Sequence, residues 1–151
     1  MDAIQLLKAD HRKVRELLDK LADTTARGEK TRTALLGRIT TELEVHTQIE
    51  NEIFYPAFKK AGEKDGDAKM VFEAREEHRT VGDLVLPDLN KTSPGSEQFS
   101  GRAKVLKELV EHHVKEEEGD MFPRAKKLMS KDQLEALGDK LAARKQQLLK
   151  K

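Results

Sequence analysis

The sequence contains the stretch His46-Thr47-Gln48-Ile49-Glu50-Asn51-Glu52-Ile53-Phe54-Tyr55-Pro56 and repeats its pattern as His113-Val114-Lys115-Glu116-Glu117-Glu118-Gly119-Asp120-Met121-Phe122-Pro123. Each copy has a histidine, a glutamate four residues later, two large apolar or aromatic residues and then a proline. His46 and His113 are 67 residues apart, and the same separation relates His11 to His78. Because self-similarity at a fixed period indicates a repeated structural unit, we expect a duplicated helical hairpin. Each half then carries one histidine followed by a His-x-x-x-Glu motif.

The spacing of histidine and glutamate fits one face of an α-helix. Residues four apart lie one turn apart on the same side of a helix, so each His-x-x-x-Glu pair can point to one place. Two such helices, with two more that carry the other histidines, bring four imidazoles and two carboxylates into a shared interior. A nitrogen and oxygen donor set of this size suits divalent transition metals such as iron and is large enough for two ions. The predicted metal ligands are His11, His46, Glu50, His78, His113 and Glu117.

Composition narrows the function classes. The chain has 151 residues, the size of one ordinary domain, of which 38% are charged, with a mean hydropathy of -0.74 and a net charge of only +1. The chain therefore has no strong positive electrostatic field that would attract nucleic acid or an anionic membrane. There is no long apolar run and no signal-peptide pattern, so the sequence supports neither a membrane span nor secretion. There is also no cysteine, which excludes a zinc site of the thiolate type. We expect a cytoplasmic protein that binds neither nucleic acid nor membrane.

Apolar residues recur at helical spacing in five segments that are separated by loops. Pro56 and Pro123 are expected to kink or end the second and fourth segments, because proline lacks a backbone N–H group. We predict an all-α fold in a single domain, residues 1–151. It comprises an up-down four-helix bundle from the duplicated hairpin in residues 1–127 and a C-terminal fifth helix in residues 130–151. The five helical segments are about 2–23, from about 31 to the region of Pro56, about 68–90, from about 97 to the region of Pro123, and from 130 onward.

Four motifs in register carry a family resemblance: Asp10-His11, His46-x-x-x-Glu50 with Phe54-Tyr55-Pro56, Glu77-His78, and His113-x-x-x-Glu117 with Met121-Phe122-Pro123. Together they resemble the hemerythrin-like HHE cation-binding domain. The resemblance implies a non-haem di-iron centre of two iron ions, joined by an oxo or hydroxo bridge, inside a four-helix bundle. It also implies that carboxylates bridge the ions, histidines complete their ligand shells, and a small oxidant binds at a vacant position.

The chain departs from the oxygen-carrying members of that family in two ways. Those carriers supply two histidines from the third helix, whereas this chain has Ala74 one turn before His78. Their fourth-helix carboxylate is an aspartate five residues after the histidine, whereas this chain offers Glu117 at four and Glu118 at five. We favour Glu117 as the ligand because it repeats Glu50. Fewer protein ligands leave more open coordination positions, which favours reaction over reversible oxygen carriage.

Several polar residues near the motifs receive other predictions. His112 has Val45 as its counterpart in the first repeat, so we expect it to be half-exposed or outside the ligand set. Asp10 and Glu77 precede the paired histidines, point to a neighbouring face, and are expected at caps or in solvent.

Two glutamates and one tyrosine complete this set. Glu73 and Glu116 are weak candidates for orienting a ligand histidine. Tyr55 is expected to pack in the core, with the lining of an oxidant pocket as the alternative.

The functional hypothesis is a protein that binds or reduces dioxygen, peroxide or nitric oxide at a di-iron site. Its enzymatic version decomposes peroxide in the manner of a catalase, and its binding version is an oxygen or nitric oxide carrier or sensor. Two further classes stay open, namely iron storage and a helical interaction module with a structural metal. The sequence does not fix the oligomeric state, and manganese or zinc would accept the same donors.

Overall fold

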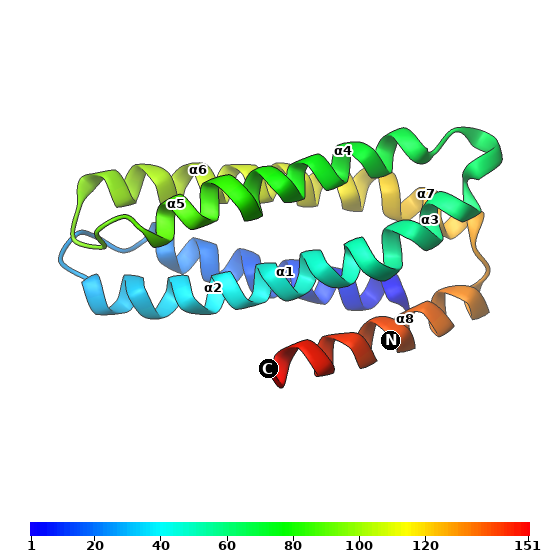
Figure 1. Ribbon diagram of the computed structural model, residues 1–151, viewed down its shortest axis with the longest axis horizontal. Coiled ribbons are helices and arrows are strands. Elements are labelled where there is room, and N and C mark those ends of the chain that lie inside the picture. Colours follow the sequence, from blue (N-terminus) through cyan, green and yellow to red (C-terminus); the bar gives the residue numbers. More distant parts are fainter.

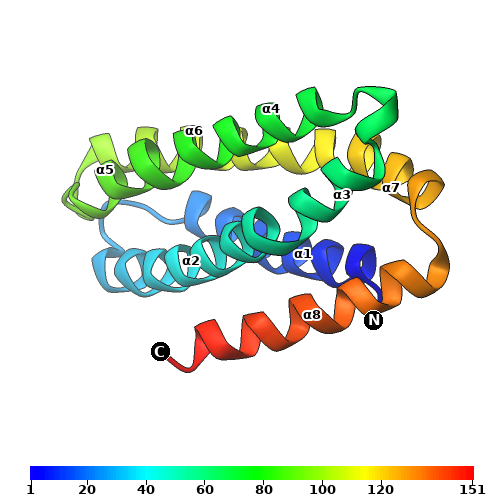
Figure 2. The same ribbon diagram turned by 45° about the vertical axis from the view of Figure 1, so that its right-hand side comes forward.

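The computed structural model describes all residues, 1–151, and every regular element in it is helical (Figure 1). The prediction of an all-α chain is therefore confirmed. Four long helical rods lie alongside one another, and a fifth helix lies outside them (Figures 1 and 2).

The first rod is α1 (Ala3–Ala22), and the second joins α2 (Glu29–Ile49), the π-helix η1 (Glu50–Phe54) and α3 (Tyr55–Ala61). The third joins α4 (Ala68–Arg79), the π-helix η3 (Thr80–Val85) and α5 (Leu86–Asn90). The fourth joins α6 (Glu97–Glu116), the π-helix η4 (Glu117–Met121) and α7 (Phe122–Leu128). The 3-10 turn η2 (Glu63–Asp65) connects the halves, and α8 (Lys131–Leu149) ends the fold.

The helix starts follow the capping signals in the sequence. Asp2 caps α1 and Ser130 caps α8, and each forms a reciprocal capping box with the glutamine three residues later. Each box satisfies two backbone N–H groups that the first helical turn leaves without partners. Ser96 caps α6 by accepting a hydrogen bond from the Phe99 N–H group. Both caps lie where the predicted first and last helical segments begin, at about residue 2 and at residue 130.

The prolines do not end their helices, so of the two outcomes predicted at Pro56 and Pro123, a kink or an end, the structure excludes the end. A π-helical segment precedes each proline, and the rods continue to Ala61 and Leu128. In these segments the Tyr55 N–H group bonds to the Glu50 carbonyl, five residues back. The wider turn accommodates a proline that cannot donate a hydrogen bond. It also changes the helical phase directly after Glu50 and after Glu117.

The core consists of two apolar clusters with a polar layer between them. Along α1, Leu7 belongs to one cluster and Val14 to the other, and His11 lies between them. Along the third rod, His78 lies in the same way between Ala74 and Val81. The apolar residues on both sides fix the helices, so the polar side chains between them are held in a rigid and dry environment.

Arg32 is a buried charge far from this polar layer, at the end where two loops meet. Its side chain is 1% exposed, and all five of its N–H donors are used. They reach the hydroxyl and carbonyl of Thr24, the carbonyls of Pro94 and Ser96, and the hydroxyl of Ser100. Because these acceptors belong to both loops and to α6, Arg32 joins the two halves at that end.

Helix α8 lies along the outside of the first half. It packs against α1, α2 and η1, and Leu134, Leu137 and Leu141 extend one of the apolar clusters. An ion pair between Arg144 and Glu52 attaches the C-terminal part of α8 to η1. None of the helices is long and apolar enough to span a lipid bilayer.

Gly138 allows α8 to approach the start of α1, and this contact yields a prediction. A Cβ atom at Gly138 would lie 2.4 Å from the Met1 carbonyl oxygen and 2.8 Å from the Ala3 backbone nitrogen. Both neighbours are backbone atoms, so Gly138→Ala should lower the free energy of unfolding by about 1–3 kcal/mol. The control is Gly101→Ala on α6, where a Cβ atom meets nothing within 4 Å. It should raise that free energy by about 0.5–1 kcal/mol, the usual gain of alanine over glycine in a helix. Urea unfolding of both variants measures the difference, and two effects of the same sign would contradict the close packing of α8.

Candidate metal centre

All six predicted ligands lie together in the polar layer, each from a different place in the chain. α1 supplies His11, α2 supplies His46, α4 supplies His78 and α6 supplies His113. Glu50 and Glu117 are the first residues of the π-helices η1 and η4. All six are buried, and Glu50 is fully inaccessible to solvent.

The six side chains form two overlapping sets that share both glutamates. One set is His11, His46, Glu50 and Glu117, and the other replaces the two histidines by His78 and His113. Within each set the ligand atoms lie within 4.8 Å of one another. The Glu50 carboxylate lies 3.0 Å from His46 Nε2 and 3.2 Å from His78 Nε2. The Glu117 carboxylate lies 3.1 Å from His11 Nε2 and 3.2 Å from His113 Nε2. Each glutamate therefore lies between the two halves.

Each histidine presents Nε2 to the glutamates and Nδ1 to an acceptor outside the ligand sets. Asp10 accepts from His46 at 2.9 Å and Glu77 from His113 at 2.7 Å. Glu118 accepts from His11 at 2.6 Å, and the Asn51 side-chain oxygen from His78 at 3.0 Å. Such partners orient ligating imidazoles and select the tautomer in which Nε2 keeps its lone pair.

These four partners correct two predictions and reveal a signal in the repeat. Asp10 is buried and holds His46, so it is neither a cap nor a solvated side chain. Glu77 is half-buried and holds His113 with one oxygen, so it is more than a solvated side chain. Glu116 instead contacts the exposed His112, so no ligand histidine is oriented by it. The sequence contained a signal for these four acceptors, because the 67-residue offset also relates Asp10 to Glu77 and Asn51 to Glu118. As predicted, His112 lies outside the buried sets and Glu117 faces them.

The donors leave room for a cation between them. Four buried atoms have no hydrogen-bond partner, namely Nε2 of His11, Nε2 of His46, Oε2 of Glu50 and Oε1 of Glu117. With Nδ1 donating outward, Nε2 faces a carboxylate oxygen, and in the neutral imidazole the two atoms meet lone pair against lone pair. Such an arrangement is unfavourable in a buried place unless a positive charge lies between the atoms. The cluster therefore indicates metal binding, and its nitrogen and oxygen donors suit a divalent transition metal.

Tyr55 contributes a hydroxyl group to the same layer. It donates to Glu117 Oε2 at 2.5 Å and lies 3.1 Å from His78 Nε2 and 3.4 Å from Glu50 Oε1. Tyr55 is fully buried in one of the apolar clusters, as predicted, and its hydroxyl in addition reaches the two glutamates of the ligand sets. Burial and the two carboxylates raise the pKa of Tyr55 well above its ordinary value, so the hydroxyl stays protonated.

The carboxylates also set the protonation of the histidines. Burial alone lowers the pKa of His46, but Glu50 and Asp10 outweigh burial and hold that pKa well above its ordinary value. The same balance raises the pKa of His113 to about 10, through Glu117 and Glu77. Burial raises the pKa of Glu117, but hydrogen bonds with Glu50 and the histidines hold it well below its ordinary value. A metal ion must displace protons from the imidazoles, so metal binding releases protons.

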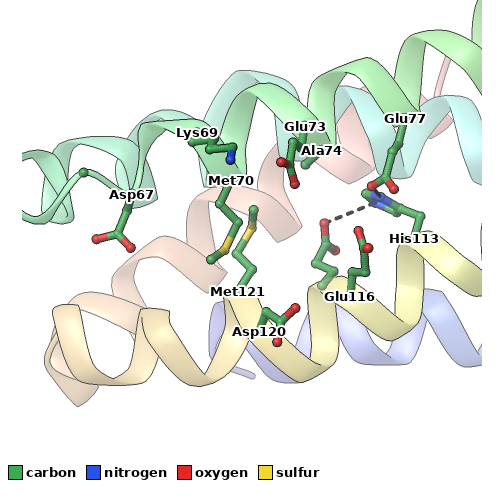
Figure 3. A pocket seen from close by; sticks show the side chains of 12 residues that line it. Asp67, Lys69, Met70, Glu73, Ala74, Glu77, His113, Glu116, Asp120 and Met121 are labelled. Atoms are coloured by element: carbon green, nitrogen blue, oxygen red, sulfur yellow. Dashed lines mark hydrogen bonds and ion pairs between the residues drawn. The ribbon is translucent and has the colours of Figure 1, made fainter.

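Two spaces adjoin the ligand sets. An apolar cavity of about 30 Å³ touches all four histidines, and five aliphatic residues line it: Val14, Leu43, Val81, Val110 and Val114. A larger, open pocket of about 320 Å³ lies between α4 and the fourth rod. Figure 3 shows Glu73 and Glu77 facing Glu116 and Asp120 across it, with Met70 and Met121 beside each other. The centre thus has a small apolar side and an acidic side open to solvent.

The pKa shifts predict how the stability of the metal-free chain depends on pH. The raised pKa of His113 contributes stability that is complete below its ordinary value of 6.5 and is lost as pH rises toward about 10. The raised pKa of His46 acts in the same direction. The lowered pKa of Glu117 contributes stability that is present above 4.5 and is lost in acid. We expect the unfolding midpoint of the chelator-treated chain to be highest between pH 4.5 and 6.5. Saturating divalent metal should abolish the alkaline decline, and a midpoint that rises between pH 6.5 and 9 without metal would contradict this picture.

Comparison with known proteins supports the resemblance. The family model of the hemerythrin HHE cation binding domain matches residues 2–125. An uncharacterized protein of Mycobacterium tuberculosis is 33% identical over 149 residues, which cover 98% of this chain and 88% of that protein. A DNA nickase of Nostoc sp. is 25% identical over 149 residues, which cover 40% of the nickase. The crystal structure of a hemerythrin HHE cation binding domain-containing protein from Mycobacterium kansasii has a TM-score of 0.84 and 32% identity, over 98% of this chain and 87% of that chain. The chain therefore belongs to the hemerythrin HHE cation-binding domain family.

Proposed function

We propose that this protein is a non-haem di-iron protein that binds or reduces a small oxidant, namely dioxygen, peroxide or nitric oxide. In this proposal the four rods form an up-down four-helix bundle built from a duplicated hairpin, and residues 1–151 are one domain. The observation that carries the proposal is that two ligand sets share Glu50 and Glu117. Glu117 turns Oε1 toward His11 and Oε2 toward His113, and Oε1 of Glu50 lies between His46 and His78. Carboxylates placed between two sets of imidazoles in this way suit a pair of neighbouring cations.

His11 and His46 would hold one ion, His78 and His113 would hold the other, and the two glutamates would bridge them. Bound iron supplies the electrons and the open coordination positions that chemistry with a small oxidant requires. The outward hydrogen bonds of the four histidines keep the imidazoles in place with their Nε2 lone pairs free. Apolar residues on both sides, with the ring of His11 stacked on Phe122, limit the access of water.

Tyr55 is suited to donate a proton to the oxidant. Its hydroxyl is buried, lies within 3.1 Å of His78 Nε2, and stays protonated because its pKa is raised. A proton donor within hydrogen-bond reach of the reacting atoms typically contributes about 10²–10⁴-fold to a rate. This position supports reduction of an oxidant over simple storage of iron.

The apolar cavity supports a size limit on the oxidant. A volume of about 30 Å³ beside four histidines has room for a molecule the size of water. Dioxygen, peroxide and nitric oxide are in this range, whereas an organic substrate is not. The aliphatic lining also favours a neutral, weakly hydrated molecule.

Reconstitution with iron tests the proposal directly. Under anaerobic conditions the chain should bind two ferrous ions, and air or peroxide should then produce new near-ultraviolet absorption bands. Glu50→Ala should lose both ions, because Glu50 belongs to both ligand sets. The control is Glu52→Ala, two residues away, where the carboxylate faces outward to Arg144 and the metal count should stay at two. Circular dichroism verifies that both variants remain helical.

The outcome of that experiment also separates the functional classes. Consumption of peroxide with evolution of oxygen identifies a catalase-like enzyme, and a reversible spectral change on gas exchange identifies a carrier. A load far above two ions per chain identifies storage. A chain that binds only zinc, with no spectral response to oxidants, would overturn the di-iron proposal and leave a structural metal.

The variant Tyr55→Phe isolates the hydroxyl group, since it keeps the ring and its packing. We expect the iron content to stay at two ions per chain and the rate of reaction with peroxide to fall by about 100-fold, within the range for loss of a proton donor. Stopped-flow absorbance measures the rate, and metal analysis measures the content. An unchanged rate would assign Tyr55 to packing alone.

A further inference from the structure

The two halves of the repeat differ on their outer faces. In the first half, Leu6, Val45 and Ile49 are buried, and α8 packs over α1, α2 and η1. At the same repeat positions the second half carries Glu73, His112 and Glu116. Ile53 is likewise replaced by Asp120. The second half thus has metal-binding side chains on the face where the first half has apolar ones and a covering helix.

Two of these side chains, His112 and Glu116, form a cluster at the surface with Glu77. His112 and Glu116 are one turn apart on α6, with His112 Nε2 3.1 Å from the Glu116 carboxylate. Glu77 reaches the same point from α4, 3.8 Å from His112 Nε2. One ligand atom from each residue lies within 4.8 Å of the other two. The side chains of His112 and Glu116 are 63% and 46% exposed, so the cluster is accessible to an ion from solution.

The cluster is continuous with the buried centre. The open pocket between α4 and the fourth rod is lined by Glu77 and Glu116 at one side and by His113 and Glu117 in its depth. Glu117 is 3% exposed, and its Oε1 atom has no hydrogen-bond partner. Ala74 also lines the pocket, whereas its counterpart Leu7 in the first half is fully buried in the core. The small side chain leaves the path open.

We propose that Glu77, His112 and Glu116 form a surface site that captures a divalent transition-metal cation and delivers it to the buried centre through this pocket. The route rests on the proposed metal function of the six buried residues, whereas the surface site itself does not. One imidazole and two carboxylates suit such an ion, and their exposure makes the site weak enough to release it. Glu77 connects the two places, because its other oxygen holds His113 Nδ1.

Charge favours this face over the opposite one. On the side covered by α8, Lys145 lies 2.5 Å from Asp10, the counterpart of Glu77. An ammonium group there repels a cation, whereas five carboxylates surround the second-half face. These are Glu73, Glu76, Glu77, Glu116 and Asp120, and they outnumber the single ammonium group of the pocket, that of Lys69. Concentrated charge of one sign along a cleft accelerates the association of an oppositely charged ligand by about 10–10³-fold.

The test is the rate of metal loading in stopped-flow absorbance with Co²⁺ as the probe. The double variant His112→Ala/Glu116→Gln removes the two donors that belong to the surface site alone. With Co²⁺ below the chain concentration, we expect loading to slow by about tenfold while the final count and spectrum remain those of the wild type. Added salt should slow the wild type more than the variant. The matched control is Glu108→Gln, which removes one exposed carboxylate from the same helix outside the pocket and should load at the wild-type rate.

Each other outcome of this test argues against the proposal in a distinguishable way. Loading of the double variant at the wild-type rate would place the route elsewhere. A lower final metal count in the double variant would assign the two residues to the buried centre. A wild-type chain that takes up no Co²⁺ and no Fe²⁺ would overturn the proposed function, and with it the route.

A second measurement addresses the surface site without the route. In the chain whose centre is already filled with Zn²⁺, substoichiometric Mn²⁺ should broaden the ring-proton signals of His112 in nuclear magnetic resonance spectra. Glu116→Gln should weaken this broadening and Glu108→Gln should leave it unchanged. Equal broadening throughout the acidic surface would show that there is no defined site.

Discussion

The structure depends on the burial of two carboxylates, Glu50 and Glu117, in the middle of a helical protein. Moving a carboxylate from water into a protein interior costs about several kcal/mol of free energy, even after the protein relaxes around it. Four histidines and one tyrosine surround the pair, so three of the four carboxylate oxygens face a group that can donate a proton or share a cation. The apolar clusters on both sides leave no other place for these charges. Both the protonation of the metal-free layer and its suitability for metal follow from this constraint.

The outer hydrogen bonds connect the halves of the duplicated chain. His46 and His113 find their acceptors, Asp10 and Glu77, within their own half, whereas His11 bonds to Glu118 of the second half. His78 reaches back to Asn51 of the first half. Two bonds within halves and two between them fix the rods against one another at the level of the ligands. Orientation of the imidazoles is therefore a property of the whole fold and not of single helices.

The repeat pattern made the ligand layer predictable, because period and phase determine which side chains share a helix face. His11, His46 and their counterparts could be assigned in this way. The outer acceptors were missed because helix phase puts Asp10 on a face next to that of His11, and only the packing of α1 on α2 turns it toward His46. Tyr55 was assigned to packing because an ideal α-helix does not carry residues five apart on one face. The π-helix η1 brings it beside Glu50, and nothing in the local sequence except the following proline indicates that wider turn.

The two halves carry corresponding ligands at an offset of 67 residues, but the surroundings of these ligands differ. Asp10 is paired with Lys145 under α8, while Glu77 lies at the open pocket near His112. His11 donates to a carboxylate, whereas His78 donates to the neutral amide of Asn51. A charged acceptor makes an imidazole a stronger donor to a cation, so the position held by His11 and His46 should bind more tightly. The position held by His78 and His113 combines a weaker donor, the Tyr55 hydroxyl and the opening to solvent. In the proposed two-ion centre, ions and small ligands should therefore exchange at the position of His78 and His113. The position of His11 and His46 binds an ion more tightly and is covered by α8, which slows exchange there.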